Sequence, residues 1–442
     1  MTGRKECGIA IVGCGTVGGA TASYLVQHAD RLAERYKTRL VLRQVVDVNW
    51  DHARKLGLPE SLLTKDIDAV LRRDDIQIVA ELIGGTTIAK AVVEKALSAG
   101  KNVVTANKAL LAKHGAELWA LARKNNVTIA FEASCAGAIP IIAVLTEELS
   151  CDNIEAMYGI VNGTCNYILS AMTQHGQSYA DALKLAQQAG LAEADPTLDV
   201  AGGDSAHKLA ILASLAFGGR IDFGRIYVEG IDKLQLQDIQ YGQELGYVIK
   251  LLAIARRQEE GLSLRVHPSF ISTRHPLAWV SGPFNAISVY AENSGHTMYY
   301  GRGAGGAPTS AAVIGDMAAV ALGTAQRKFE ELSIFPDVAP PARQVDIGSV
   351  CGRYYLRMQL EDKPGMLASI ATILGRRDIS ISSVLQREPA DESSLGVPVV
   401  ITTHPAREAD IHAALEEVNR MDSVKAPCVC IRILEEHPER TV

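Results

Sequence analysis

The chain has 442 residues, of which 48% are hydrophobic and 21% are charged, a composition typical of a folded protein and not of a disordered one. At about 150 residues per domain, this length predicts about three domains. The 44 basic and 50 acidic residues leave a net charge of −6, which argues against nucleic acid or an anionic membrane as a partner.

No apolar run approaches the roughly 18 residues needed to cross a bilayer, so we expect no membrane span. Residues 1–7 are polar and lead directly into a strand-like segment, without the apolar core of a signal peptide. The sequence therefore predicts a cytoplasmic protein.

Strand-like and helical patterns alternate over residues 1–150. Apolar runs rich in Val and Ile, each followed by helical periodicity, occupy residues 8–12, 40–46, 76–83, 102–105 and 127–131. Continuous apolar runs joined by helices indicate a parallel sheet that is covered by helices on both faces. We therefore expect an N-terminal doubly wound α/β domain.

The first of these strands ends in the motif GxGxxG, directly before a helical segment. Gly13 permits a tight turn, Gly15 lets the backbone approach a pyrophosphate, and Gly18 allows the helix to pack closely on the strand. Thr16 and Val17 open the helix, whose free N–H groups attract an anion. This context predicts a Rossmann domain that binds NAD or NADP, and a glycine-rich turn without a ligand is the alternative.

The second strand ends at Asp47, where a carboxylate can accept a hydrogen bond from the ribose 2′-hydroxyl of NAD. No arginine follows until Arg54, so a 2′-phosphate has no obvious partner nearby, although Lys or Arg from elsewhere in the chain can supply one. Asp47 equally suits a surface position at a strand end. We favour NAD over NADP and leave both open.

Further segments close the later strands, and the carboxyl ends of parallel strands form the ligand crevice of such a sheet. In their order, these segments resemble homoserine dehydrogenases over residues 8 to about 325. The resemblance implies NAD(P)-dependent interconversion of L-homoserine and L-aspartate 4-semialdehyde, a step of threonine, methionine and isoleucine biosynthesis. The segments that carry it are Ile83-Gly84-Gly85, Thr105-Ala106-Asn107-Lys108-Ala109-Leu110-Leu111, and residues 131–140, 159–169 and 192–209.

Residues 193–208 combine four carboxylates with one lysine, directly before an apolar helical stretch. If a helix runs from about 204 to 217, Asp204 and Lys208 lie four residues apart on one face and can touch. Interconverting an alcohol and an aldehyde requires a proton carrier on the oxygen, and a partly desolvated lysine suits this task. An ion pair on a solvated helix face is the alternative from spacing alone. The resemblance implies that Lys208 transfers the proton and that Asp204 lies beside it.

Homoserine is a zwitterion, so its ammonium group requires a carboxylate, and its carboxylate requires a cation or N–H groups. Glu193 and Asp199 are suitable partners for the ammonium group, and the resemblance implies that Glu193 binds the amino acid. Asn162, Gly163 and Thr164 form a turn that opens a helix and can present N–H groups and a hydroxyl to the substrate. A turn without a ligand is the alternative.

Lys108 follows the fourth strand at the start of a helix, where the helix dipole disfavours a cation. This placement predicts a local anionic partner. The resemblance implies that Lys108 lies beside nicotinamide and substrate, where it orients the reacting carbonyl or contacts the cofactor, and an exposed lysine is the alternative. Gly84, at the end of the third strand, should lie near the nicotinamide. The resemblance also places Gly303 near the cofactor, although its segment reads equally as a glycine-rich connector.

Residues 132–139 resemble the loop that binds a monovalent cation in homoserine dehydrogenases. The resemblance implies that the carboxylate of Glu132 and the main-chain carbonyls of Cys135, Gly137 and Ile139 hold sodium or potassium. Cys135 stands where valine is more usual, but a carbonyl ligand does not depend on its side chain. We therefore expect the cation site to be retained.

Residues 151–330 read as an α+β domain for substrate binding, catalysis and dimerisation, in which residues about 300–325 return to the cofactor domain. A proline-rich stretch at residues 331–349 predicts a linker. Residues 350–442 follow a βαββαβ pattern that resembles an ACT regulatory domain, in which Gly365 permits backbone contact with a small amino acid. Because ACT domains pair side by side, the resemblance implies a homodimer or homotetramer. Threonine, the end product of the pathway, is the expected effector by analogy.

These observations predict a monofunctional member of this family without an upstream kinase domain, since the first strand begins within ten residues of Met1. Two alternatives remain, namely another amino-acid or semialdehyde dehydrogenase on the same scaffold, and an amino-acid sensor that has lost catalysis. Intact Asp204 and Lys208 argue against the sensor.

Overall fold

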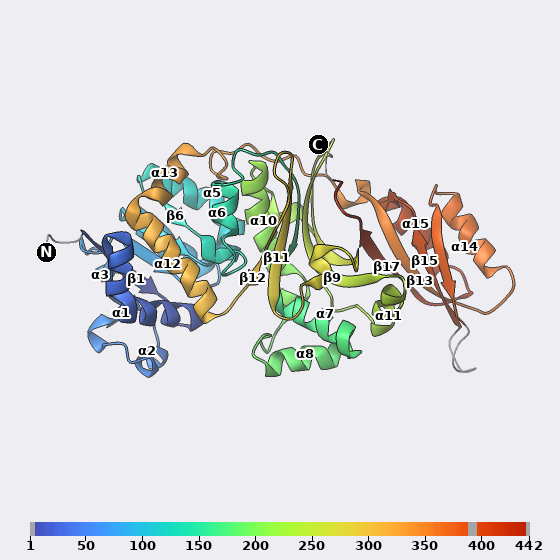
Figure 1. The fold of residues 1–442 in the computed structure, drawn as a ribbon, viewed down its shortest axis with the longest axis horizontal. Coiled ribbons are helices and arrows are strands. Elements are labelled where there is room, and N and C mark those ends of the chain that lie inside the picture. Colours follow the sequence, from blue (N-terminus) through green and yellow to red (C-terminus); the bar gives the residue numbers. More distant parts are fainter. Residues whose placement is uncertain (1–4, 388–395, 439–442) are drawn as a thin grey trace.

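The computed structural model describes residues 5–387 and 396–438, which form three parts arranged in a row (Figure 1). The N-terminal part contains a parallel sheet with the strand order β3-β2-β1-β4-β5-β6, which confirms the doubly wound prediction. Its strands are β1 Lys5–Val12, β2 Thr38–Val46, β3 Leu63–Thr64, β4 Ile78–Glu81, β5 Asn102–Thr105 and β6 Ile129–Ala130.

Helices cover both faces of this sheet, and one of them comes from much later in the chain. The helix α12 (Gly306–Leu322) packs beside α1 (Thr16–Tyr36) on one face, where Gly306 lies against Thr16 and Ala20. The chain therefore returns to the first domain after it has built the second. The other helices of this part are α2 Asp51–Lys55, α3 Ile67–Leu71, α4 Thr87–Ser98, α5 Lys108–Lys124, α6 Ile141–Thr146 and α13 Thr324–Glu331.

The middle part is built on antiparallel strands in the order β12-β11-β7-β9-β10. The helices α7 (Gly163–His175) and α10 (Gly203–Phe217) pack on this sheet. The strands are β7 Ile154–Ile160, β8 Tyr227–Val228, β9 Tyr247–Gln258, β10 Gly261–Ser272, β11 Phe284–Ala291 and β12 Gly295–Arg302. The remaining helices are α8 Tyr179–Gln188, α9 Thr197–Val200 and α11 Leu236–Glu244.

The C-terminal part has the predicted βαββαβ order of an ACT domain. Its last strand, β17, lies parallel to β10, so the middle and C-terminal sheets form one sheet of 11 strands. The elements are β13 Cys351–Leu360, α14 Met366–Gly375, β14 Ile381–Gln386, β15 Val397–Thr403, β16 Ala406–Arg407, α15 Glu408–Asn419 and β17 Val424–Leu434. The C-terminal domain is therefore joined to the middle domain by main-chain pairing.

The proline-rich segment expected to be a linker packs closely on the middle domain. The N–H groups of Leu262 and Arg220 donate to the carbonyls of Arg343 and Pro340, each at 2.7 Å. Within residues 5–387 and 396–438, no single helix is long and apolar enough to cross a membrane, and only the bent pair α12 and α13 has the combined length and composition.

A buried ion pair fastens the C-terminal domain to α11. The Arg357 guanidinium on β13 donates to both oxygens of Asp238, at 2.5 and 3.0 Å, and the Tyr355 hydroxyl donates to the same carboxylate at 3.0 Å. The side chains of Asp238 and Arg357 are 1% and 7% exposed. Removal of either partner leaves the other charge buried and unpaired.

We expect Asp238→Ala to lower the free energy of unfolding by about 3 to 5 kcal/mol, because it leaves the Arg357 charge buried without a counter-charge. Chemical denaturation measures this loss. The matched control is Glu416→Ala, which breaks the exposed ion pair between Arg420 and Glu416 and should cost less than about 1 kcal/mol. An equal effect of the two variants would contradict the assigned importance of the buried pair.

Candidate active site

The carboxylate of Asp204 is the centre of a buried polar cluster. Its Oδ2 accepts hydrogen bonds from Lys208 Nζ at 2.7 Å and from Asn162 Nδ2 at 2.8 Å. Its Oδ1 lies 3.1 Å from Lys108 Nζ. The cluster therefore joins the starts of α10, α7 and α5.

Each side chain is placed by the first turn of its helix. Asp204 lies at the start of α10, where the helix dipole favours a negative charge, and Lys208 follows one turn later on the same face. Asn162 caps α7, and its Oδ1 accepts a hydrogen bond from the Cys165 N–H at 2.8 Å. Lys108 is the first residue of α5, and Asp204 is the anionic partner that this placement predicted.

The electrostatics of the cluster keep Asp204 ionised. Burial opposes ionisation, but the charges of Lys208 and Lys108 outweigh it and hold the pKa of Asp204 below its usual value. The charge of Asp204 in turn raises the pKa of Lys108, against the effect of burial. Burial raises the pKa of Asp199, against a hydrogen bond from Asn162. The site thus holds a fixed negative charge between two cations.

Lys208 is buried, and two acceptors hold its ammonium group. Nζ donates to Asp204 at 2.7 Å and to the main-chain carbonyl of Val161 at 2.6 Å. An ammonium group has three N–H bonds, so one remains for an oxygen atom of a ligand. The alternative of an exposed ion pair is wrong, because the Lys208 side chain is only 9% exposed.

The predicted substrate turn makes contacts within the protein. Asn162 Nδ2 donates to Asp199 Oδ1 as well as to Asp204, each at 2.8 Å, so its amide holds the two carboxylates together. The Thr164 hydroxyl donates to the carbonyl of Leu191 at 2.7 Å. Gly163 lies so close to the Pro283 carbonyl that a Cβ would approach it to 2.9 Å. These contacts fix the turn beside the cluster.

Glu193 is exposed and lies outside the hydrogen-bonded cluster. It follows two residues after Leu191, so the Thr164 hydroxyl anchors the loop that carries it. Among the residues that the structure describes, none forms a hydrogen bond or ion pair with the Glu193 carboxylate. That carboxylate therefore keeps its hydrogen-bonding capacity.

The glycine motif has the shape that a pyrophosphate requires. Gly13 has a φ of +97°, and a Cβ at Gly18 would lie 1.9 Å from the Gly13 carbonyl. Gly15 is the N-cap of α1, so no side chain covers the first N–H groups of this helix from the cap position. A Cβ at Gly15 would meet nothing within 4 Å. The first N–H groups of α1, where Thr16 and Val17 lie, are thus accessible to an anion. The residues present fit a dinucleotide.

Asp47 supports this motif from the end of β2. Its Oδ2 accepts a hydrogen bond from the Cys14 N–H at 2.6 Å, and its Oδ1 accepts one from the Asn49 N–H at 3.0 Å. The carboxylate therefore lies beside the glycine motif, and its remaining lone pairs can accept a further hydrogen bond.

Glu81 is a buried carboxylate that the sequence did not single out. It accepts hydrogen bonds from the Ile83 and Gly84 N–H groups at 3.0 and 3.2 Å, and from the Thr105 hydroxyl at 2.6 Å. The Thr105 oxygen accepts in turn from the N–H of Asn107, next to Lys108. Glu81 thereby fixes two crevice loops, and the only sequence signal was a carboxylate at the end of an apolar strand.

The segment resembling a cation loop is tightly folded. Ala136 and Gly137 both have a φ of +54°, and Gly137 packs against the Gly303 carbonyl. The Glu132 carboxylate accepts hydrogen bonds from the Ile142 and Ala143 N–H groups at the start of α6, each at 2.8 Å. Burial raises the pKa of Glu132 to about 7. Both oxygens of this carboxylate, the expected cation ligand, are therefore bonded to the start of α6.

No group of three or more His, Cys, Asp or Glu side chains in the described part of the chain could hold a metal ion. A cation at this loop would depend on main-chain carbonyls, including those of Cys135 and Ile139. One further residue that the sequence did not indicate is Asn285, whose buried amide has no hydrogen-bond partner among the described residues. A Cβ at Gly303 would lie 2.0 Å from its Nδ2, so close packing on Asn285 requires this glycine.

Comparisons with known proteins match three stretches of the chain. A family model described as homoserine dehydrogenase matches residues 140–318, the model of its NAD-binding domain matches residues 13–132, and an ACT domain model matches residues 354–422. A homoserine dehydrogenase of Neisseria gonorrhoeae is 41% identical over 98% of this chain and 100% of its own length.

Two solved structures are also similar. The crystal structure of a homoserine dehydrogenase from Thiobacillus denitrificans has a TM-score of 0.92 and 40% identity, and the match covers 98% of this chain and 100% of that chain. A hyperthermophilic archaeal homoserine dehydrogenase in complex with NADPH has a TM-score of 0.60 and 26% identity, with 72% and 98% covered.

We expect Glu81→Leu to weaken dinucleotide binding by about tenfold or more, because two loop N–H groups and the Thr105 hydroxyl lose their acceptor. Fluorescence titration with the reduced dinucleotide measures the Kd. The matched variant Glu81→Gln keeps the shape and one acceptor oxygen, so it should bind more tightly than Glu81→Leu. Unchanged affinity in both variants would show that Glu81 does not organise the crevice.

Proposed function

Because the chain belongs to the homoserine dehydrogenase family, we propose that it interconverts L-homoserine and L-aspartate 4-semialdehyde through Lys208. It is an oxidoreductase with an NAD(P)-binding domain. The observation that carries the proposed role of Lys208 is its buried ammonium group, which is held by Asp204 and Val161 and has one N–H to spare.

The bound NAD(P) supplies the hydride acceptor or donor for the alcohol carbon. In the reducing direction, the Lys208 ammonium group donates a proton to the carbonyl oxygen as the alcohol forms. In the oxidising direction, the neutral amine accepts the proton of the substrate hydroxyl. Asp204 orients this group through the contact at 2.7 Å.

We assign Lys108 to the same reacting oxygen or to the nicotinamide side of the crevice. It lies three residues after the end of β5, and its ammonium group contacts Asp204. Its side chain is 33% exposed and Lys208 is 9% exposed, so Lys108 is the more accessible of the two cations. This difference supports an orienting role for Lys108 and proton transfer by Lys208.

Substrate binding is assigned to residues around the cluster. Glu193 is the proposed acceptor for the substrate ammonium group, because its carboxylate has no partner among the described residues, and Asp199 is the second candidate. The turn formed by Asn162, Gly163 and Thr164 is proposed to position the amino acid from the start of α7.

The proposed cofactor is NAD, held by the glycine motif and Asp47, with Gly84 and Gly303 near the nicotinamide. NADP is the second candidate. Arg54 and Lys65 both lie over the Trp50 ring, at 5.6 and 5.7 Å from its centroid, just beyond the end of β2. Glu60 already pairs with Arg54, which leaves Lys65 as the cation for a 2′-phosphate.

Three further features are proposed from the family. Sodium or potassium would bind the carbonyls of Cys135, Gly137 and Ile139, with Glu132 beside them. Threonine would bind the ACT domain near Gly365, where a φ of +88° and open space leave the backbone accessible. Pairing of ACT domains would give a homodimer or homotetramer. The fixed geometry at Asp204 and Lys208 does not favour a sensor without activity.

Lys208→Ala should lower kcat by about 10²-fold to 10⁴-fold, because the proton carrier is lost. It should leave dinucleotide affinity unchanged. Initial rates with L-homoserine and a binding titration measure the two quantities. The control is Lys184→Ala, which removes an exposed lysine of α8 and should retain full activity. Normal turnover of Lys208→Ala would remove this residue from its assigned role.

Asp47→Ser should lower kcat/KM with NAD by about tenfold and affect NADP less, since only NAD offers the 2′-hydroxyl that Asp47 binds. Initial rates with each cofactor give the ratio of the two constants. Asp51→Ser, at an exposed position of the next helix, is the control and should leave the ratio unchanged. Equal losses with both cofactors would mean that Asp47 only supports the glycine motif.

A further inference from the structure

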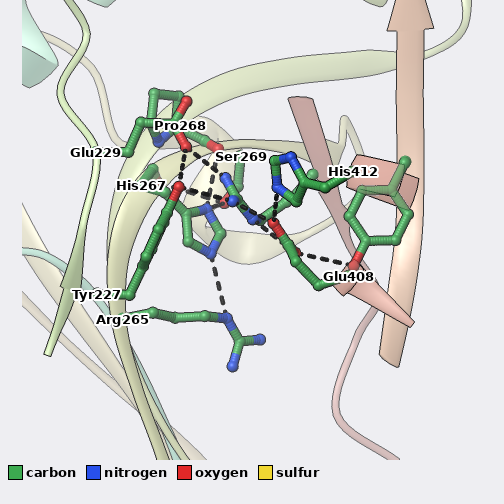
Figure 2. Close-up of polar contacts among 10 residues, drawn as sticks. Tyr227, Glu229, Arg265, His267, Pro268, Ser269, Glu408 and His412 are labelled. Atoms are coloured by element: carbon green, nitrogen blue, oxygen red, sulfur yellow. Dashed lines mark hydrogen bonds and ion pairs between the residues drawn. The ribbon is translucent and has the colours of Figure 1, made fainter. Parts of the chain in front are cut away.

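A second buried polar cluster lies where the ACT domain meets the middle domain (Figure 2). Its centre is Arg432 on β17, which is 8% exposed. The Arg432 guanidinium donates to Glu408 Oε2 at 3.0 Å on the ACT side. On the middle-domain side it donates to Glu229 Oε2 at 2.6 Å and to the Tyr227 hydroxyl at 3.0 Å. One side chain therefore joins the two domains.

The strand β10 places these groups together, because its edge is shared by two partners. Arg265 and Val266 pair with β8 of the middle domain, and residues 269–271 pair with β17 of the ACT domain. The segment after β8 continues along the same edge, where the Glu229 N–H donates to the Val266 carbonyl at 2.8 Å. Glu229 thus lies beside Arg432 at the point where the two partners of β10 meet.

The ACT side of the cluster is buried and has several hydrogen bonds. Glu408 is 1% exposed and also accepts hydrogen bonds from the Tyr354 hydroxyl at 2.9 Å and from His412 Nε2 at 3.0 Å. Arg432 is held to it by two of its nitrogen atoms. The side chain of Glu229, by comparison, is 38% exposed. The ion pair between Arg432 and Glu229 is therefore more accessible to solvent than the one between Arg432 and Glu408.

The segment after Glu229 packs directly on the turn that enters the active site. The Ile231 N–H donates to the Val200 carbonyl at 2.8 Å, and a Cβ at Gly230 would lie 2.3 Å from the same carbonyl oxygen. At Gly202, a Cβ would lie 3.0 Å from Val228. Val200 ends the helix that contains Asp199, and Gly202 caps α10, which begins with Gly203 and Asp204.

We propose that the ion pair between Arg432 and Glu229 positions the turn between α9 and α10, so that the ACT domain helps to set the geometry of Asp199 and Asp204. Arg432 and Glu229 are positioning residues, because neither touches the reacting atoms. This inference rests on the proposed function, since it assigns catalytic use to the turn. Removal of the Glu229 charge should loosen residues 199–204 and weaken substrate binding, while the glycine motif stays unchanged.

The test is Glu229→Gln in the full chain, which keeps the side-chain shape and leaves Arg432 paired with Glu408. We expect the KM for L-homoserine to rise about five- to tenfold, with a smaller change in kcat and unchanged dinucleotide affinity. Hydrogen exchange of residues 199–208 should become faster, whereas exchange in α1 should not change. The matched control is Glu435→Gln, which breaks the ion pair of Glu435 with Arg353 at 3.7 Å without touching the cluster.

A second variant separates positioning from general loss of stability. Arg432→Lys keeps a charge beside Glu408 but loses the fork that reaches Glu229. Combined with Glu229→Gln, it should add little to the rise in KM, because both substitutions remove the same ion pair, that between Arg432 and Glu229. Unchanged exchange of residues 199–208 in Glu229→Gln, or fully additive effects in the double variant, would overturn the proposal. The exchange readout needs no turnover, so an inactive wild-type protein would refute the proposed function separately.

Discussion

The ionised carboxylate of Asp204, buried between two lysines, is the constraint on which the site depends. A carboxylate can remain charged in a buried position only if cations and hydrogen-bond donors replace water. Lys208, Lys108 and Asn162 supply them from α10, α5 and the cap of α7. The contact between the N-terminal domain and the middle domain therefore completes the set of groups that surround this carboxylate. The same requirement brings Lys208, the proposed proton carrier, to the side of the middle domain that meets Lys108.

The sequence predicted those parts of the site that depend on local spacing. Asp204 and Lys208 lie four residues apart in one helix, so helix geometry predicted that they share a face. Lys108 begins another helix, so the helix dipole predicted an anionic partner for it. The bonds of Asn162 to two carboxylates did not follow, because its partners lie 37 and 42 residues away. Glu81 was missed for the same reason, since its partner Thr105 belongs to a neighbouring strand.

The fold shows a similar division between local and distant information. The alternation of strands and helices predicted the doubly wound sheet and the βαββαβ order of the ACT domain. It did not predict that β17 pairs with β10, because a pairing between segments 163 residues apart leaves no local pattern. Nor did proline content reveal that residues 340–344 are bonded to the middle domain, since proline marks a break in periodicity and not mobility.

The shared edge of β10 has a consequence for how the chain can be divided. Main-chain groups of residues 269–271 are satisfied by β17, whatever side chains the ACT domain carries. A fragment ending before β13 would expose these N–H and C=O groups as an unprotected strand edge, which is a template for pairing between molecules. The first two domains alone would therefore be prone to self-association, and losing the ACT domain in evolution would require a new cover for that edge.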